Sequence, residues 1–183
     1  MEKIVRNYLE IKSLDELLVE KKPSNNCSLE QVSPNDFQLN KFFYKQIGKN
    51  HQWVDRLAWT NKNWTEYVSS PNVFTFILRK NGDIAGFFEL IYHKNKSEIE
   101  IAYFGLLKEY MGKKLGGYML SEAIKTSFLY NVKRVWVHTC SLDHKNALKN
   151  YLSRGMKIYN IETTNIKINE KIDKKIFTLP KLN

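Results

Sequence analysis

The sequence is poor in cysteine, with only Cys27 and Cys140 among its 183 residues. Their separation has no spacing typical of a metal site, and two cysteines exclude a disulfide-based scaffold. No apolar run approaches the ~20 residues of a membrane-spanning helix, which excludes an integral membrane protein. Charges interrupt the segment MEKIVRNYLEIKSLDE, so it does not read as a secretory signal. We therefore expect a cytoplasmic protein without a metal site.

Blocks of like charge and arginine-rich stretches are also missing, although the net charge is +10. A basic protein has RNA or a phosphorylated cofactor as natural partners. Here the lysines are scattered, and Lys, Asn and Ile are abundant together, as AT-rich codon usage produces. Basic and aromatic residues are not interleaved as in nucleic-acid motifs. These patterns favour solvated surface lysines, and an RNA- or protein-binding domain ranks last among the functions considered.

The composition predicts one globular domain over residues 1–183. The apolar fraction is 43%, and no internal repeat or low-complexity linker divides the chain. Strands are expected over 4–11 and 27–32, with a loop at 21–26 between them. A helix is expected with Ser33 as N-cap and Pro34 at its first position. A second helical pair, or an irregular tryptophan-rich arm, follows over 51–70.

The centre of the chain changes to strand periodicity. Asn81-Gly82 and a second turn near Asn95 separate apolar runs, which predicts an antiparallel meander of three strands over 73–107. An amphipathic helix, a strand over 132–142, a short helix ending at Gly155 and a late strand from 157 follow. A strand–helix–strand unit predicts one parallel step. The expected fold class is α+β, with a mostly antiparallel mixed sheet and flanking helices.

The stretch MGKKLGG (111–117) places glycines where the amphipathic helix begins. A helix start has unpaired N–H groups and a partial positive charge, and glycine lets an anion approach them closely. The spacing matches neither the Walker motif nor G-x-G-x-x-G. Taken alone, the stretch fits a tight turn as well as a phosphate cradle.

Two longer stretches narrow the choice. EIEIAYFGLLKEYMGKKLGGYML (98–120) resembles the central motif of the GNAT superfamily of N-acetyltransferases, in which a strand, a loop of the form [R/Q]-x-x-G-x-[G/A] and a helix bind acetyl-coenzyme A. DHKNALKNYLSRGM (143–156) resembles the second signature of the family, N-x-x-A-x-x-x-Y-e-x-x-G-F. Met111, Lys114 and His144 depart from these patterns. The resemblance implies a GNAT-like fold with an arm at 27–70 on the acceptor side, the meander at 73–107 and an acetyl-coenzyme A-binding core at 108–160.

The resemblance also implies coenzyme contacts. The main chain of Phe104 and Leu106 would hold the pantetheine arm where a bulge opens the strand, and the Leu106 N–H would polarise the thioester carbonyl. The N–H groups from Gly112 to Gly117 would bind the pyrophosphate. The complete predicted set is Phe104, Leu106, Met111, Gly112, Lys113, Lys114, Leu115, Gly116, Gly117 and His144.

Proton transfer needs a base and an acid. The resemblance implies Glu100 as base and Tyr151 as acid, in a direct transfer without an acyl-enzyme. Glu89 competes as base, because a carboxylate among aromatic residues has a raised pKa. His138 is a further acid–base candidate or a packed histidine, and Cys140 is expected to be a small buried residue.

The acceptor is expected to bind at the helical arm, where Trp53, Asp55 and Trp59 lie. Asp55 suits an ammonium and the tryptophans suit a cation or an aromatic group, although packing explains them equally well. The leading prediction is an acetyl-coenzyme A-dependent N-acetyltransferase for a primary amine of a small molecule or peptide, acting as a monomer or homodimer. The main alternative is a non-catalytic module that senses acetyl-coenzyme A.

Overall fold

A seven-stranded sheet forms the centre of the computed structural model, which describes residues 2–33, 36–51 and 53–166. The strands are β1 (Glu2–Ile11), β2 (Cys27–Gln31), β3 (Val73–Lys80), β4 (Asp83–His93), β5 (Glu98–Leu106), β6 (Arg134–Cys140) and β7 (Lys157–Ile166). The helices are α1 (Phe37–Gly48), α2 (Asn61–Val68), α3 (Leu115–Phe128) and α4 (Ala147–Ser153), with short 3-10 turns η1 (Leu14–Glu16), η2 (Lys94–Lys96) and η3 (Lys108–Tyr110). The strand order is β2-β3-β4-β5-β6-β1-β7.

The antiparallel meander predicted over 73–107 is confirmed as β3, β4 and β5. Asn81 and Gly82 turn the chain with φ of 55° and 87°, the left-handed conformation that Asn-Gly hairpin turns require. β5, α3 and β6 then form the predicted parallel step. The fold class expected from the sequence is therefore confirmed.

A β-bulge in β5 changes which way its side chains point. Glu89 lies opposite Tyr103 but Leu90 lies opposite Ile101, so Ala102 is the extra residue. Phe104 consequently packs with the same core cluster as Ile101. Among the described residues, β5 pairs with β6 only over Glu98–Glu100, and its remaining length diverges from β6.

Strand β1 occupies an interior position that its sequence did not indicate. It lies between β6 and β7 and is antiparallel to both, with Leu9 opposite Val137 and Ile158. Leu9 and Ile11 are fully buried. The first strand of the chain therefore joins two strands from its last third.

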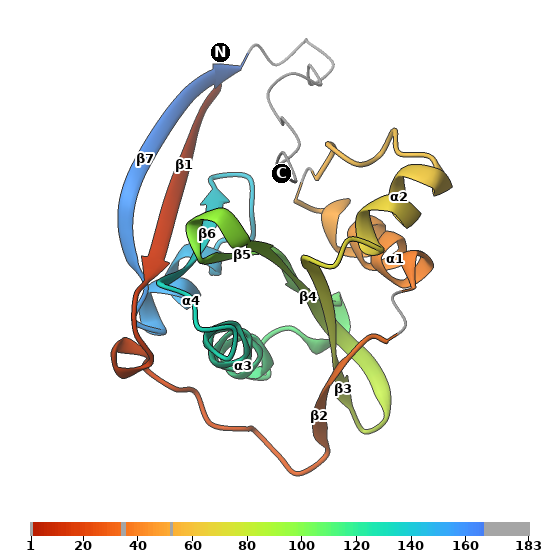
Figure 1. The fold of residues 1–183 in the computed structure, drawn as a ribbon, viewed down its shortest axis with the longest axis horizontal. Helices are drawn as coiled ribbons and strands as arrows, with labels where there is room; N and C mark the ends of the chain where they lie inside the picture. Colours follow the sequence, from red (N-terminus) through yellow and green to blue (C-terminus); the bar gives the residue numbers. More distant parts are fainter. Residues whose placement is uncertain (1, 34–35, 52, 167–183) are drawn as a thin grey trace.

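The helices cover opposite faces of the sheet (Figure 1). α3 packs on one face through its apolar stripe, which includes Met119, Leu120 and Ile124. α1 and α2 cover the other face, where Phe43 stacks on Phe87 with ring centroids 4.6 Å apart. Both faces of the central strands are thus buried.

The start of α1 differs from the prediction. Asp36, not Ser33, is the N-cap, and its side chain accepts a hydrogen bond from the Gln38 N–H. Aspartate and serine cap helices comparably well, so residue type alone does not fix where this helix begins. Pro34 and the residues beyond 166 lie outside the described part of the chain. The tryptophan-rich stretch expected over 51–70 holds one regular helix, α2, after turns over 55–58, and a capping box of Thr60 and Asn63 begins this helix.

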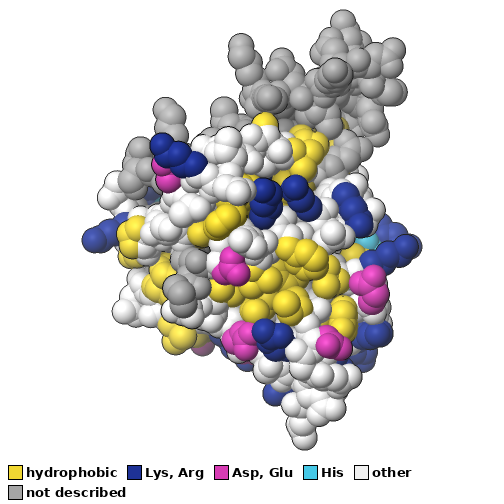
Figure 2. All heavy atoms as spheres, turned by 90° about the vertical axis from the view of Figure 1, so that its right-hand side faces the viewer, with side chains coloured by type: hydrophobic (Ala, Val, Ile, Leu, Met, Phe, Trp, Pro, Cys, Tyr) yellow, Lys and Arg dark blue, Asp and Glu magenta, His cyan; other side chains and the backbone are white. Residues whose placement is uncertain are grey.

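Charges of both signs are interspersed on the face that carries α1 and α2 (Figure 2). Hydrophobic side chains gather near the middle of this face, with basic and acidic side chains around them. The mixture agrees with scattered surface lysines on this side of the molecule. Among the described residues, no helix is long and apolar enough to cross a membrane.

Candidate functional site

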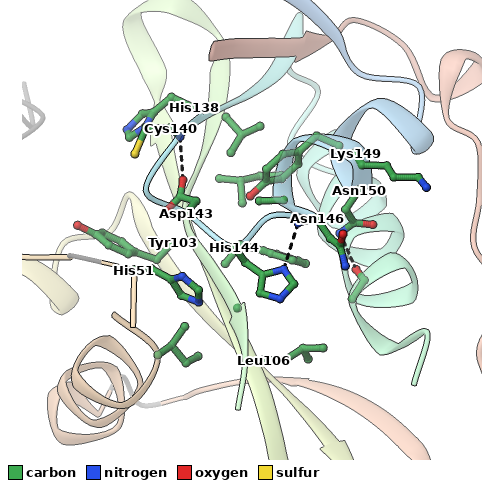
Figure 3. A pocket seen from close by; sticks show the side chains of 18 of the residues that line it. His51, Tyr103, Leu106, His138, Cys140, Asp143, His144, Asn146, Lys149 and Asn150 are labelled. Carbon is green, nitrogen blue, oxygen red and sulfur yellow. Dashed lines mark hydrogen bonds between the residues drawn. The ribbon is translucent and has the colours of Figure 1, made fainter. Parts of the chain in front are cut away.

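A cavity of about 670 Å³ opens where β5 and β6 diverge. Its wall comes from β5, β6, the start of α3, the segment leading into α4, and the connection between α1 and α2. In Figure 3, His51 and Tyr103 lie on one side of this cavity, and Asn146, Lys149 and Asn150 on the other. The parallel step of the sheet therefore produces the space.

The open side of β5 exposes main-chain groups to the cavity. The Leu107 N–H donates to Ala85 O on the β4 side. Because N–H groups alternate along a strand, those of Leu106 and Phe104 point the other way, toward the gap left by β6. Phe104 and Leu106 both line the cavity. These positions are suited to bind an extended polar chain by main-chain hydrogen bonds.

The start of α3 points unpaired N–H groups at the same cavity. Lys114 is the N-cap and makes no side-chain capping bond, which leaves the first-turn N–H groups free for an anion. Lys114 has φ 60° and Gly112 has φ 76°. A left-handed residue at 114 explains why glycine is usual at this place in the motif, and lysine holds the conformation at a cost of about 1–2 kcal/mol.

A side chain in place of Gly116 would meet different surroundings from one in place of Gly117. A Cβ on Gly117 would lie 2.5 Å from Arg154 Nη1, so a side chain there would have to displace the end of Arg154 and disturb its ion pair with Glu20. A Cβ on Gly116 would make ordinary contacts of 3.7 Å with Asn150 and Leu106. The fold therefore tolerates a side chain at 116, and the absence of one widens the cavity.

Glu100 is a buried carboxylate in the cavity wall, with 5% of its surface exposed. Its Oε2 lies 2.9 Å from His93 Nε2 on the neighbouring strand β4. The His93 ring stacks on Trp136 at 5.9 Å, which fixes its orientation. Glu100 therefore lines the cavity and also contacts His93, which is partly exposed. The sequence did not indicate a role for His93.

Tyr151 lies on α4 and packs edge-on against Phe104, with ring centroids 6.2 Å apart. Burial, and to a lesser extent the charge of Asp143, raises the pKa of Tyr151. Its hydroxyl has no hydrogen-bond partner among the described residues, although the residue lines the cavity. The hydroxyl is therefore protonated and free to donate.

His138 and Cys140 point from β6 toward the cavity (Figure 3). Protein surrounds His138 on its other sides while the cavity keeps it accessible; this burial lowers its pKa, and Glu100 opposes the shift. Burial also raises the pKa of the Cys140 thiol, which makes it a poor nucleophile. Asp143 accepts hydrogen bonds from the Cys140 N–H and the Thr139 hydroxyl, which orders the turn before α4.

The arm contributes an anionic group to the opposite wall. Asp55 accepts hydrogen bonds from the Tyr44 hydroxyl at 2.7 Å and the Tyr103 hydroxyl at 2.6 Å. Trp53 also lines the cavity, with its ring 4.8 Å from that of Tyr103. Two of the three predicted acceptor residues, Trp53 and Asp55, are thus part of one aromatic wall.

Glu89 and Trp59 lie outside this wall and contact Arg56 instead. Glu89 is 1% exposed and accepts from Arg56 Nη1 and the Tyr67 hydroxyl, both at 2.9 Å, and from Asn40. The Arg56 guanidinium lies 4.7 Å from the Trp59 ring and 4.0 Å from the Tyr67 ring. The cation that these aromatic rings enclose is therefore the side chain of Arg56. The sequence did not predict that Arg56 organises the site.

The structure brings most of the predicted site residues together. The cavity wall includes Trp53, Asp55, Glu100, Phe104, Leu106, Met111, Gly112, Lys114, Gly116, Gly117, His144 and Tyr151. It does not include Trp59, Glu89, Lys113 or Leu115. The Leu115 side chain is buried in the core, and Lys113 Nζ lies 5.5 Å from the Tyr110 ring centroid.

Comparison with known families agrees with this architecture. The model of the acetyltransferase (GNAT) family matches residues 37–156. The chain belongs to the GNAT acetyltransferase family. Curated proteins include no match to it. The family match spans α1, α2, the meander and both signature stretches.

Solved structures share the GNAT fold at low identity. A functionally unknown conserved protein from Staphylococcus epidermidis is 18% identical, with a TM-score of 0.59 over 88% of this chain and 60% of that one. A GCN5-related N-acetyltransferase from Kribbella flavida is 14% identical, with a TM-score of 0.60 over 84% and 54%. An aminoglycoside acetyltransferase from an uncultured soil metagenomic sample is 12% identical, with a TM-score of 0.60 over 73% and 90%. The chain thus spans little more than half the length of the first two, and these likenesses show the fold alone.

Proposed function

We propose that the protein is an N-acetyltransferase that moves an acetyl group from acetyl-coenzyme A directly to a primary amine of a small molecule or peptide. The observation that carries the proposal is the convergence on one cavity of the open side of β5, the uncapped start of α3, Glu100 and Tyr151. Each of these supplies one requirement of acyl transfer to an amine.

The residues of the wall fit the coenzyme. Free N–H groups of the first turn of α3 would bind the diphosphate, with the Lys114 side chain adding positive charge. The Phe104 and Leu106 main chain would bind the pantetheine arm, since its amide groups match unpaired strand positions. The coenzyme supplies the acetyl group in activated form, as a thioester.

The chain's own side chains would move the protons. Glu100 would accept the proton that the amine loses as its nitrogen forms the new bond to carbon. The Leu106 N–H would donate a hydrogen bond to the carbonyl oxygen as negative charge develops on it. Tyr151 would donate its proton to the sulfur when the carbon–sulfur bond breaks, so that a free thiol leaves.

One structural neighbour bears on the acceptor. It is an aminoglycoside acetyltransferase from a soil metagenomic sample, and one of its two similar structures is in complex with sisomicin (TM-score 0.56, 12% identical, over 71% of this chain and 86% of that one). Aminoglycosides are small molecules that carry amines. Together with the carboxylates of the wall, this supports a small-molecule amine over a macromolecular acceptor.

A free-thiol release assay tests the proposal. The protein is incubated with acetyl-coenzyme A and a panel of amines, amino acids, polyamines and short peptides. Amine-dependent thiol release that is abolished by Glu100→Gln, with the product identified as the N-acetylated amine by mass spectrometry, is the expected result. Binding of acetyl-coenzyme A by calorimetry without thiol release from any amine contradicts the proposal and favours a sensor.

A further inference from the structure

A buried cluster of two carboxylates and one guanidinium extends from the acceptor wall into the protein behind it. Asp55, Arg56 and Glu89 have side chains that are 16%, 2% and 1% exposed. Two carboxylates and one guanidinium carry a net charge of −1. A buried charge without a partner is costly, so the composition of this cluster needs an explanation.

The single cation of the cluster is committed to Glu89. Arg56 Nη1 lies 2.9 Å from Glu89 Oε1, whereas Arg56 Nε lies 3.9 Å from Asp55 Oδ2. Burial opposes the charge of Arg56, but Glu89 outweighs it and raises the arginine pKa. Glu89 does not line the cavity, while Asp55 does. The uncompensated negative charge therefore resides on Asp55, at the cavity surface.

The neighbours of Asp55 orient it without neutralising it. Tyr44 and Tyr103 donate one hydrogen bond each, to different carboxylate oxygens. Burial raises the pKa of Tyr103, so this donor stays neutral. A carboxylate accepts about four hydrogen bonds, so each oxygen keeps room for another donor. Trp53 and Tyr103 line the cavity beside it, and aromatic rings with a carboxylate form a good site for an ammonium group.

Among the described residues, Arg56 is the only cation within ion-pair distance of Asp55, and the histidines of the cavity do not supply another. His51 lines the same region, and burial lowers its pKa, as burial also lowers that of His138, so both are neutral at pH 7. The Arg6 side chain forms a hydrogen bond with Tyr8. Lys114, Lys149 and Arg154 belong to α3 and α4, and Arg154 is paired with Glu20. Glu100, from β5, adds a second carboxylate to the wall.

We infer that the acceptor is a dication, and that Asp55 binds a second ammonium or guanidinium group distinct from the amine that receives the acetyl group. The inference rests on the proposed function, which assigns the reacting amine to Glu100. Two carboxylates from different elements then hold two cationic groups of one acceptor. A monoamine bound at Glu100 would leave Asp55 with no cation nearer than Arg56, whose Nε lies 3.9 Å away.

Matched amines test this inference. Thiol release is measured with 1,4-diaminobutane, longer linear diamines and the monoamines of equal chain length. The wild type is expected to prefer at least one diamine over its matched monoamine by about tenfold or more in kcat/KM, because a buried polar group is left unpaired by the analogue. In Asp55→Asn this ratio is expected to fall toward one. Glu66→Gln, an exposed carboxylate of α2, is the matched control and is expected to keep it.

Equal rates for diamines and monoamines in the wild type, or an unchanged preference in Asp55→Asn, overturn the inference. If no amine releases thiol, the proposed function fails separately, and the melting temperature decides the inference. A rise with diamine but not monoamine, lost in Asp55→Asn, supports it; no difference between the amines overturns it. Should Asp55→Asn not fold, Asp55→Glu takes its place, and the wild-type comparison still decides.

Discussion

Burial keeps the Tyr151 hydroxyl protonated, and the contact between its ring and Phe104 holds the side chain in place. The pKa of Tyr151 is raised above the ordinary value of about 10, first by burial and then by Asp143. The proton is therefore present throughout the neutral and mildly alkaline range. We expect kcat not to decline between about pH 8 and 10 through loss of this acid, since that loss begins only as the pH approaches the raised pKa.

Removing the Tyr151 hydroxyl is expected to lower turnover without weakening coenzyme binding. Tyr151→Phe should reduce kcat by about 10²-fold, the usual contribution of a positioned acid, because the ring and its contact with Phe104 remain. Steady-state kinetics and calorimetry with acetyl-coenzyme A measure the two effects. A wild-type rate in the variant would contradict the assignment.

Lys114 combines a strained backbone with a charge, and substitution separates the two. Lys114→Gly should raise the free energy of unfolding by up to about 1 kcal/mol, because glycine adopts φ 60° without strain. The same change should weaken coenzyme binding, and the loss should shrink at high salt, where screening reduces the charge effect. Denaturant titration and salt-dependent calorimetry measure these effects; equal affinities at low salt would show that the charge has no role.

At the scale of elements, the two glycines in the first turn of α3 differ in how much room surrounds them. Gly116→Ala should keep or raise stability, by up to about 1 kcal/mol, because alanine favours helix and its Cβ makes ordinary contacts. It should weaken acetyl-coenzyme A binding, since the methyl group narrows the cavity between Leu106 and Asn150. Gly117→Ala should be less stable than Gly116→Ala, because its Cβ would displace the end of Arg154 and disturb the ion pair with Glu20. Paired thermal melts and calorimetry distinguish the two; a Gly116→Ala variant with full affinity would place the coenzyme elsewhere.

Local sequence patterns predicted where the helices and strands lie better than they predicted which residues contact one another across the fold. Asn81-Gly82 specified a hairpin, and Gly155, with φ 90°, follows α4 where a helix-ending glycine was expected. The resemblance of two stretches identified residues that do meet in one cavity. The ion pair between Glu89 and Arg56 could not be predicted from the sequence. The two residues are 33 positions apart, and nothing in the intervening sequence specifies their contact. The His93–Glu100 contact depends likewise on the register of β4 and β5, which the bulge at Ala102 shifts.

At the scale of the whole molecule, Glu89 connects the sheet to α1, to α2 and to the segment between them. It lies on β4 and contacts Asn40 of α1, Arg56 of the connection and Tyr67 of α2. Glu89→Gln should lower the free energy of unfolding by about 3 kcal/mol, because the buried guanidinium loses its hydrogen-bonded counter-charge and keeps only the more distant Asp55. Urea denaturation measures the loss. Glu89→Leu combined with Arg56→Met should recover part of it, since neither charge then remains; no recovery would contradict this origin of the loss.

The position of β1 has a consequence for how the protein is made. Ribosomes synthesise β1 before the six other strands of the sheet, yet both of its neighbours, β6 and β7, belong to residues 134–166. While the more than 100 residues between them are synthesised, β1 exposes hydrogen-bonding edges that have no partner strand, a condition that promotes aggregation. The interior of the sheet is therefore completed only after residue 166 has emerged, and correct folding depends on β1 staying unaggregated until then.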